Sequence, residues 1–233
     1  PLGIPLVDDS ALVRLASTYA PIFEIDVASS DDRLGTPGFD ALGKPVVDLS
    51  QATVTVRAAH TRVADRVLLQ LVYTAWFPAR TRLGRFDLLG GRFDGLVWRV
   101  TLASDGEPLV YDTIHPCGCY HMFFPTTRAE PLPAPPGIEE FSFVPQRMPD
   151  RMTQAAGARV VLRIASITHY LENLRLEVVP AATPYVFLAD DSLRSLPAGA
   201  GRRASLFGAD GLVEGTERLE RCLFWPSGIA SAG

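Results

Sequence analysis

A Ser-Asp-Gly-Glu sequence at residues 104–107 constrains the fold more than any other stretch of the chain. It lies between two runs of strand-forming residues, 96–102 and 109–115. Asp-Gly is a favoured centre for a two-residue type I′ turn, which joins two antiparallel strands. The sequence therefore predicts a tight hairpin, and the turn sets which residues face each other across it.

In this register Arg99 lies opposite Asp112, and Asp94 lies opposite Cys117, diagonally adjacent to His115. Side chains alternate between the two faces of a strand. The face that we expect in the core carries Leu96, Trp98, Val100, Leu102, Tyr111, Thr113 and His115. We expect Arg99 and Asp112 to form a surface pair, which contributes at most about 1 kcal/mol.

Runs rich in Val, Leu, Thr and aromatic residues recur along the chain and predict further strands. They lie at residues 22–25, 54–59, 66–77, 141–144, 160–168, 175–179, 185–188 and 220–225. Helical periodicity is clear only after Asp8-Asp9-Ser10, a capping sequence for a helix that Pro21 stops. We expect an all-β, antiparallel, jelly-roll-like β-sandwich with one short N-terminal helix and long loops, among them residues 29–45.

A proline-rich stretch near 130–137 is the one plausible internal boundary. The expected strands on its two sides are alike in composition. We therefore expect residues 1–233 to form a single β-sandwich domain, with this stretch as a crossover.

Composition excludes some functions. The formal charge is −4 and Lys44 is the single lysine, so we expect no nucleic-acid partner. No apolar run reaches the roughly 20 residues of a membrane-spanning helix. The chain begins with Pro-Leu-Gly, and we expect that a preceding segment, including any signal peptide, has been lost. Few lysines and many Arg, Pro and Gly suit a bacterial protein, and the oligomeric state stays open.

Residues 115–121 contain two of the four histidines and two of the three cysteines. The sequence predicts a metal site of His115, Cys117, Cys119 and His121 for one divalent transition metal, Zn or Cu. Asp94 would orient a ligand or act as a fifth one. Because the spacing is tight, we expect at most three of the four to reach one ion, with another ligand from His60 or His169. An open coordination position would make a Lewis-acid hydrolase in which Asp94 and His115 are the catalytic residues.

Three other interpretations stay open. His115 can be an ordinary strand-end histidine. Cys117 and Cys119 can form a small, readily reduced disulfide, which also favours a periplasmic or secreted location. The third is a binding module without catalytic activity, in which aromatic residues line a groove for a small molecule, a carbohydrate or a lipid. Those aromatic residues are Tyr73, Trp76, Phe77, Trp98, Tyr111 and Tyr120. Cys222, in an apolar run, is expected to be a buried free thiol.

Several motifs bear on the family. They are Tyr73-Thr-Ala-Trp-Phe-Pro78, a glycine-rich loop that leads to Gly91-Arg-Phe-Asp94, a strand that begins at Val97-Trp98, and the hairpin that returns to His115. Together, residues 68–121 resemble the core block of the necrosis-inducing (NPP1-like) proteins. The resemblance implies a β-sandwich, a divalent cation near Asp94 and attachment to glycolipid head groups.

The chain departs from the family at the motif Gly-His-Arg-His-Asp-Trp-Glu. Gly91 and Phe93 stand in place of its histidines, Gly95 in place of its tryptophan and Leu96 in place of its glutamate. Asp94 alone matches the motif's acidic residues. We therefore carry over the fold class and the importance of Asp94, and not the toxin activity.

Overall fold

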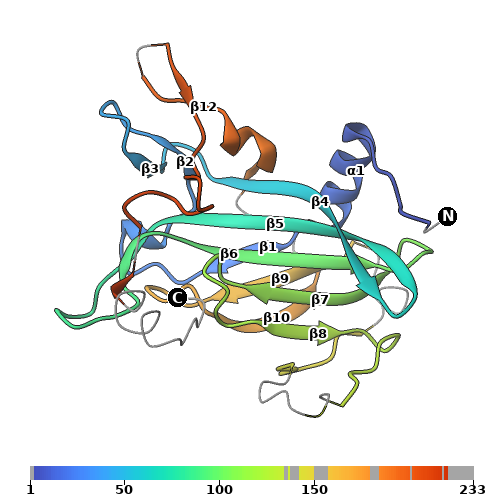
Figure 1. Ribbon diagram of the computed structural model, residues 1–233. Helices are drawn as coiled ribbons and strands as arrows, with labels where there is room; N and C mark the ends of the chain where they lie inside the picture. Colours follow the sequence, from blue (N-terminus) through green and yellow to red (C-terminus); the bar gives the residue numbers. More distant parts are fainter. Residues whose placement is uncertain are drawn as a thin grey trace.

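The computed structural model describes residues 3–133, 136, 142–149, 157–178, 184–199, 201–216 and 218–219. Two sheets that face each other form an all-β sandwich, which confirms the predicted fold class (Figure 1). In the described part of the chain, no helix is long and apolar enough to cross a membrane. The predicted strand at 220–225, with Cys222 in it, lies outside the described residues. The single-domain assignment stays a prediction.

The larger sheet has six strands in the order β11-β4-β5-β6-β7-β8. Their bounds are Val186–Ala189 for β11, Thr53–Val63 for β4, Arg66–Arg80 for β5, Gly91–Leu102 for β6, Pro108–Ile114 for β7 and Met122–Pro125 for β8. Strands β4 to β8 pair with their sequence neighbours as an antiparallel meander. Because consecutive strands are adjacent, short turns fix which residues meet at the ends of the sheet.

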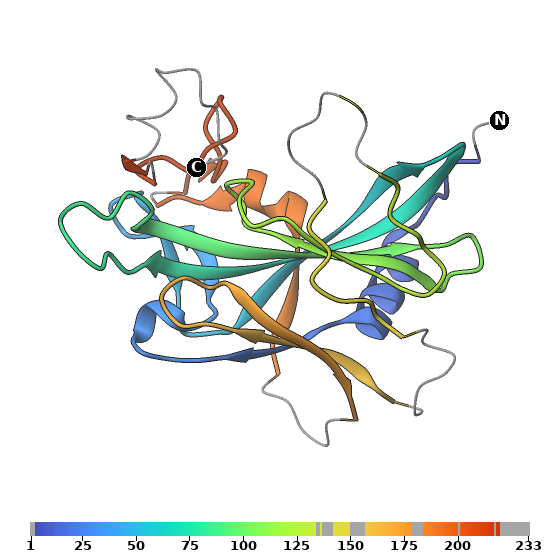
Figure 2. The ribbon, with the colours of Figure 1, turned by 90° about the horizontal axis from the view of Figure 1, so that it is seen from below.

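The smaller sheet has the order β1-β9-β10, with β1 at Ile22–Ile25, β9 at Arg159–Ile164 and β10 at Leu171–Glu177. Strand β1 pairs in parallel with β9, so the N-terminal segment adds to a hairpin formed much later in the chain. Strand β11 is also parallel to its neighbour β4, and the sandwich is therefore mainly, not wholly, antiparallel. Figure 2 shows the blue and orange strands of this smaller sheet on one side of the green strands of the larger one.

The remaining elements are short. They are α1 (Asp9–Tyr19), η1 (Ser30–Asp32), η3 (Asp190–Arg194), and the two-stranded pairs β2 (Thr36–Phe39) with β3 (Pro45–Asp48) and β12 (Leu196–Pro197) with β13 (Arg203–Ala204). The predicted helix cap is confirmed, since the Asp8 side chain accepts a hydrogen bond from the Ala11 N–H. The expectation of a loop throughout 29–45 is wrong, because this stretch contains η1 and β2 and reaches the start of β3.

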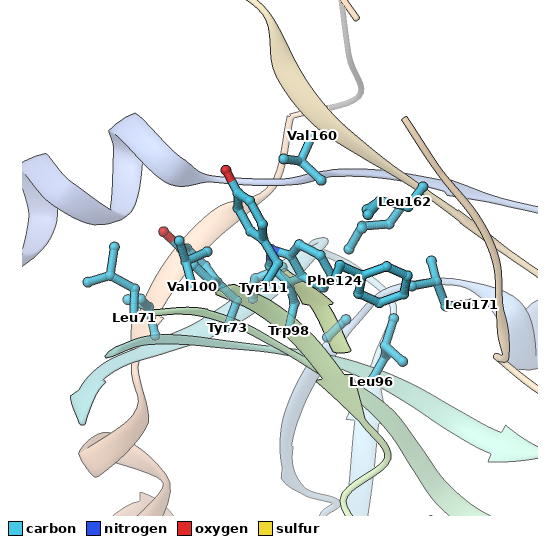
Figure 3. Close-up of a cluster of buried hydrophobic side chains, with 14 of the residues drawn as sticks. Leu71, Tyr73, Leu96, Trp98, Val100, Tyr111, Phe124, Val160, Leu162 and Leu171 are labelled. Atoms are coloured by element: carbon cyan, nitrogen blue, oxygen red, sulfur yellow. The ribbon is translucent and has the colours of Figure 1, made fainter. Parts of the chain in front are cut away.

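The main core lies between the two sheets, and its members come from both (Figure 3). From the larger sheet come Leu71, Tyr73, Leu96, Trp98, Val100, Tyr111 and Phe124, and from the smaller one Val160, Leu162 and Leu171. The hairpin residues that we expected in the core are there. Burying each large apolar side chain contributes about 1.5–3 kcal/mol, so this layer holds the two sheets together.

The predicted hairpin register is confirmed from Val97 to Thr101, with Arg99 opposite Asp112 and Trp98 opposite Thr113. The turn itself differs from the prediction. The Ala103 N–H donates to the Glu107 carbonyl and Gly106 has a φ of 85°, so the loop is one residue longer than a two-residue type I′ turn.

A register shift between residues 101 and 102 compensates for the longer turn. Beyond this bulge, the partners are those that a two-residue turn would have set. Two departures from the ideal hairpin thus cancel, and Asp94 and His115 keep the face on which the sequence placed them.

A second, smaller core lies on the other face of the larger sheet. Its buried members are Val47, Trp76, Phe93, Leu193, Leu196, Leu206 and Val213. Through these contacts, η3, β12 and residues 206–213 pack against one end of that face. The segments form one wall of a groove that is described below.

Candidate functional site

Asp94 on β6 and His115 at the end of β7 are both buried and point into the sandwich, as predicted. The distance from His115 Nδ1 to Asp94 Oδ1 is 3.9 Å. Burial lowers the pKa of His115, and the nearby Asp94 carboxylate opposes this shift only in part. His115 is therefore a neutral imidazole at pH 7, and its Nε2 has no hydrogen-bond partner.

His169, in the loop between β9 and β10, is the closer partner of Asp94. Its Nδ1 lies 2.6 Å from Asp94 Oδ2, and its ring stacks on Phe77 at 3.8 Å with an interplanar angle of 2°. Its Nε2 lies 3.3 Å from Asp32 Oδ1, an ion-pair distance without the alignment of a hydrogen bond. One fully buried imidazole thus lies between two carboxylates.

Asp32, at the end of η1, is fully buried. Burial alone would raise its pKa, but backbone N–H groups of Ile167, Ser29 and Ala28 donate to the carboxylate and the net pKa is lowered. These bonds tie the η1 turn to the loop that carries His169. The carboxylate is satisfied as an anion without a metal.

Arg218 supplies a cation to the same centre. Its guanidinium donates to the Phe93 carbonyl at 2.8 Å and to Asp94 Oδ1 at 3.3 Å. A Cβ at Gly91 would lie 2.4 Å from the Arg218 Nη1, so a larger residue there would displace the guanidinium. We call Asp32, Asp94, His115, His169 and Arg218 the buried polar centre.

The backbone around this centre is strained. Among the described residues, five non-glycine positions have a positive φ, and four of them flank the buried polar centre. These are Phe93, Tyr120, Ile167 and His169. Each such residue costs roughly 1–3 kcal/mol and persists only where surrounding contacts hold it.

The turn at residues 115–119 has the same form as the 103–107 turn. The His115 N–H donates to the Cys119 carbonyl, the Gly118 N–H donates to the His115 carbonyl, and Gly118 has a φ of 92°. Pro116 suits the position after His115 because its φ is fixed, and glycine suits the positive φ. The turn holds Cys117 and Cys119 close together, both half-buried and neither in a disulfide.

A hydrogen bond with Cys119 lowers the pKa of Cys117 to about 7, against the opposing effect of burial. The predicted Cys117–Cys119 disulfide is not formed, and both residues are thiols. The two sulfur atoms nonetheless interact, which places them within reach of each other.

His121 lies on the opposite face of the larger sheet from His115. Its Nε2 is 3.1 Å from Asp112 Oδ2 and 2.8 Å from the Arg99 guanidinium. Asp112 is buried beneath these two side chains. The expectation that Arg99 and Asp112 form a simple surface pair is therefore wrong.

The four predicted metal ligands do not converge, because His115 and His121 point to opposite faces. Within the ranges that the structure describes, no group of three or more His, Cys, Asp or Glu side chains is placed to hold a metal ion. The carboxylate of Asp94 already has His169 and Arg218 as partners. These residues do not fit the divalent cation that the family resemblance implies, and the predicted Zn or Cu site has no support here.

Four of the six aromatic residues predicted to line a groove belong instead to the main core: Tyr73, Phe77, Trp98 and Tyr111. Tyr120 is partly exposed and packs edge-on against His115 and Tyr170. Trp76 alone faces the other side of the sheet, where its Nε1 donates to the Thr55 hydroxyl. Alternation along β5 explains the split, since neighbouring residues face opposite sides.

Trp76 lines a groove of about 780 Å³ on this outer face. The floor comes from β4, β5 and β6, and the wall from η3 and residues 205–211; Pro116 of the 115–119 turn lies at its edge. The lining residues used below are Arg57, Asp190, Asp191, Arg194, Thr74 and Phe207. The volume is in the range that holds a small ligand.

The charged residues of the groove are only loosely paired. Arg57 Nε lies 3.9 Å from Asp190 Oδ2, and Arg194 Nε lies 3.7 Å from Asp191 Oδ1. Both distances exceed those of hydrogen bonds. The guanidinium of Arg194 also lies 5.9 Å from the centre of the Phe207 ring. Donors and acceptors are therefore available to a molecule that enters.

No sequence pattern marks Asp32 and Arg218 as members of the buried polar centre, because their partners are far away along the chain. The sequence predicts His60 or His169 as a further metal ligand. In the structure His169 forms a hydrogen bond with Asp94 instead. The groove residues of η3 had no pattern that marks them, since a surface loop with Asp and Arg is common.

The chain is thus a β-sandwich protein with a groove large enough for a small ligand. No family model and no curated protein matches it. Among solved structures, it is similar to NLPPya in complex with mannosamine, with a TM-score of 0.43 and 15% identity over 85% of this chain and 88% of that chain. The complex of NLPPya with glucosamine has a TM-score of 0.46 at the same identity and coverage.

A structure described as a "toxin fold for microbial attack and plant defense" has a TM-score of 0.44 and 13% identity, over 91% of this chain and 96% of that chain. All three TM-scores are below 0.5, and no identity exceeds 15%.

Proposed function

We propose that this protein is a ligand-binding module that holds a small polar molecule of the carbohydrate class in the groove on the outer face of its larger sheet. The observation that carries this proposal is the set of loosely paired charges in a groove of ligand size. Asp190 is mostly buried, with a side-chain exposure of 19%, whereas Arg57 beside it is half exposed at 49%. A ligand that bonds to both groups would replace water rather than break a strong ion pair.

The chemistry of the lining suits a sugar. Carboxylates accept hydrogen bonds from hydroxyl or ammonium groups, guanidinium groups donate to ring and hydroxyl oxygens, and the Thr74 hydroxyl does both. Phe207 offers an aromatic surface for the apolar face of a pyranose ring. A lipid chain would need a more continuous apolar lining than these four charged side chains leave.

A catalytic role for Asp94 and His115 stays a prediction, and the burial of both residues argues against it. A reaction needs access for a substrate, and both side chains are at most 6% exposed. The groove and the buried polar centre lie on opposite faces of the larger sheet. Binding in the groove therefore does not require that centre to act chemically.

The test is isothermal titration calorimetry with a panel of monosaccharides and amino sugars, including the glucosamine and mannosamine present in two neighbouring structures. We expect saturable binding of at least one of them. Arg57→Ala and Asp190→Asn should each weaken it about tenfold or more, because loss of a hydrogen bond to a charged group costs about 1.5–3 kcal/mol.

Arg62→Ala is the matched control, because Arg62 is an exposed arginine on the same strand, and its one hydrogen bond within the described residues is to the Ala64 carbonyl. It should bind as the wild type does. Absence of binding across the panel, or binding that is equal in all four proteins, contradicts the proposal.

A further inference from the structure

The 115–119 turn presents two thiols in a conformation that the chain fixes on several sides. Two backbone hydrogen bonds close the turn, and Gly118 adopts a φ that other residues rarely take. Pro116 is pressed against the sheet, since a Cβ at Gly95 would lie 3.0 Å from its ring. These contacts restrict the backbone conformation of the turn, and the turn in turn sets the positions of Cys117 and Cys119.

The two thiols interact with each other rather than with the histidines near them in sequence. Neither histidine of the 115–121 segment turns toward them, since His115 enters the sandwich and His121 bonds on the outer face. The sulfur of Cys117 interacts with that of Cys119. Both residues are half-buried rather than fully enclosed.

We propose that Cys117 and Cys119 form a reversible redox pair that closes to an intramolecular disulfide by exchange with small-molecule disulfides. The inference concerns a different site from the sugar groove and does not depend on the proposed function.

The exchange proceeds in two steps. The thiolate of Cys117 attacks one sulfur of the small disulfide, an S–S bond forms to Cys117, and one small thiolate leaves. The thiolate of Cys119 then attacks the Cys117 sulfur and expels the second small thiolate. Two protein thiols are oxidised, one small disulfide is reduced to two thiols, and the protons of Cys117 and Cys119 pass to the two departing thiolates.

Reversibility follows from the size of the ring. A disulfide across one intervening glycine closes a small ring that departs from ideal disulfide geometry. Strained and accessible disulfides are reduced more readily than structural ones. The pair should therefore follow the thiol–disulfide balance of its surroundings.

The test uses the full chain with Cys222→Ser, so that the third cysteine takes no part. After incubation with oxidised glutathione, intact mass spectrometry should show loss of two hydrogen atoms and no bound glutathione. Peptide mapping should place the bond between Cys117 and Cys119, and excess reduced glutathione should restore both thiols.

Adding Cys119→Ser removes the resolving thiol, and the protein should then stop at one glutathione on Cys117. Peptide mapping of the wild-type protein gives the same information if Cys222→Ser does not fold. A stable mixed disulfide in the two-thiol protein, no reaction at all, or a bond that reduced glutathione does not open would each overturn the proposal.

Discussion

His169 Nδ1 lies 2.6 Å from Asp94 Oδ2 inside the sandwich, and it joins the smaller sheet's loop to the larger sheet's third meander strand. The ring also stacks on Phe77, which is the cross-strand neighbour of Asp94. This contact joins residues 75 positions apart in sequence. It therefore links the two sheets at the end of the sandwich that contains the predicted site residues Asp94 and His115.

Replacing His169 with Ala should destabilise the protein by about 3–5 kcal/mol, because it leaves the buried Asp94 and Asp32 carboxylates with one fewer compensating group. Urea unfolding followed by circular dichroism measures the change. His60→Ala is the control, since the exposed His60 side chain has one hydrogen bond in the described part of the chain, with the Pro5 carbonyl, and its loss should cost below about 1 kcal/mol. Equal losses for the two variants would contradict the account of the buried polar centre.

His115 should make stability depend on pH. Its folded pKa is lowered from the usual 6.5 by burial, so the folded state binds fewer protons than the unfolded state. The stability is fully present above pH 6.5 and is lost progressively as pH falls below it. The urea midpoint should fall between pH 7.5 and 5.5, and His115→Gln should reduce that fall. An unchanged pH dependence in the variant would show that His115 is not buried as a neutral ring.

The Cys117 thiol should react with iodoacetamide at a rate that rises through about pH 7, because Cys119 donates a hydrogen bond that favours the thiolate. The measurement is mass spectrometry of the alkylated protein with Cys222→Ser. Adding Cys119→Ala removes the donor and should move the midpoint upward toward the usual value of 9.0. If the midpoint does not move, the interaction between the two sulfur atoms is absent in solution.

Two ion pairs of one hairpin allow a matched comparison. Asp112→Ala should cost about 1–3 kcal/mol, because Asp112 is buried and serves both Arg99 and His121. Asp105→Ala removes the exposed pair with Arg128 and should cost at most about 1 kcal/mol. Urea unfolding measures the loss of unfolding free energy in each variant. A larger loss for Asp105→Ala than for Asp112→Ala would refute the assignment of Asp112 as a buried partner.

The strand pattern predicted most of the fold because alternation of apolar residues is local information. The pairing of Arg99 with Asp112 was predicted from a two-residue turn at Asp105-Gly106, but the actual turn is one residue longer. The bulge after Thr101 offsets this extra residue, so the pairing is unchanged. No sequence rule would have located the bulge. The parallel pairing of β1 with β9 could not be foreseen, since it joins segments far apart in the chain.

The predicted metal ligands are neighbours in sequence, but in the described structure they are not gathered in space. His115 and His121 are close in sequence, but they follow a turn and a register that send them to opposite faces of the sheet. Asp32 and Arg218 reach Asp94 through long-range packing, which leaves no local trace. The groove depends on where η3 packs on the larger sheet. The residues of η3 show no periodic sequence pattern that would predict this position.

The central claim is that a small polar ligand binds on the outer face of the larger sheet. The most direct measurement is nuclear magnetic resonance of the ¹⁵N-labelled protein during titration with the best ligand of the sugar panel. We expect saturable shift changes at the Trp76 indole N–H and at the amides of Thr74 and Phe207, with none at the 103–107 turn. Shift changes that are absent, or that map to other faces and spare all three groove positions, would contradict the account.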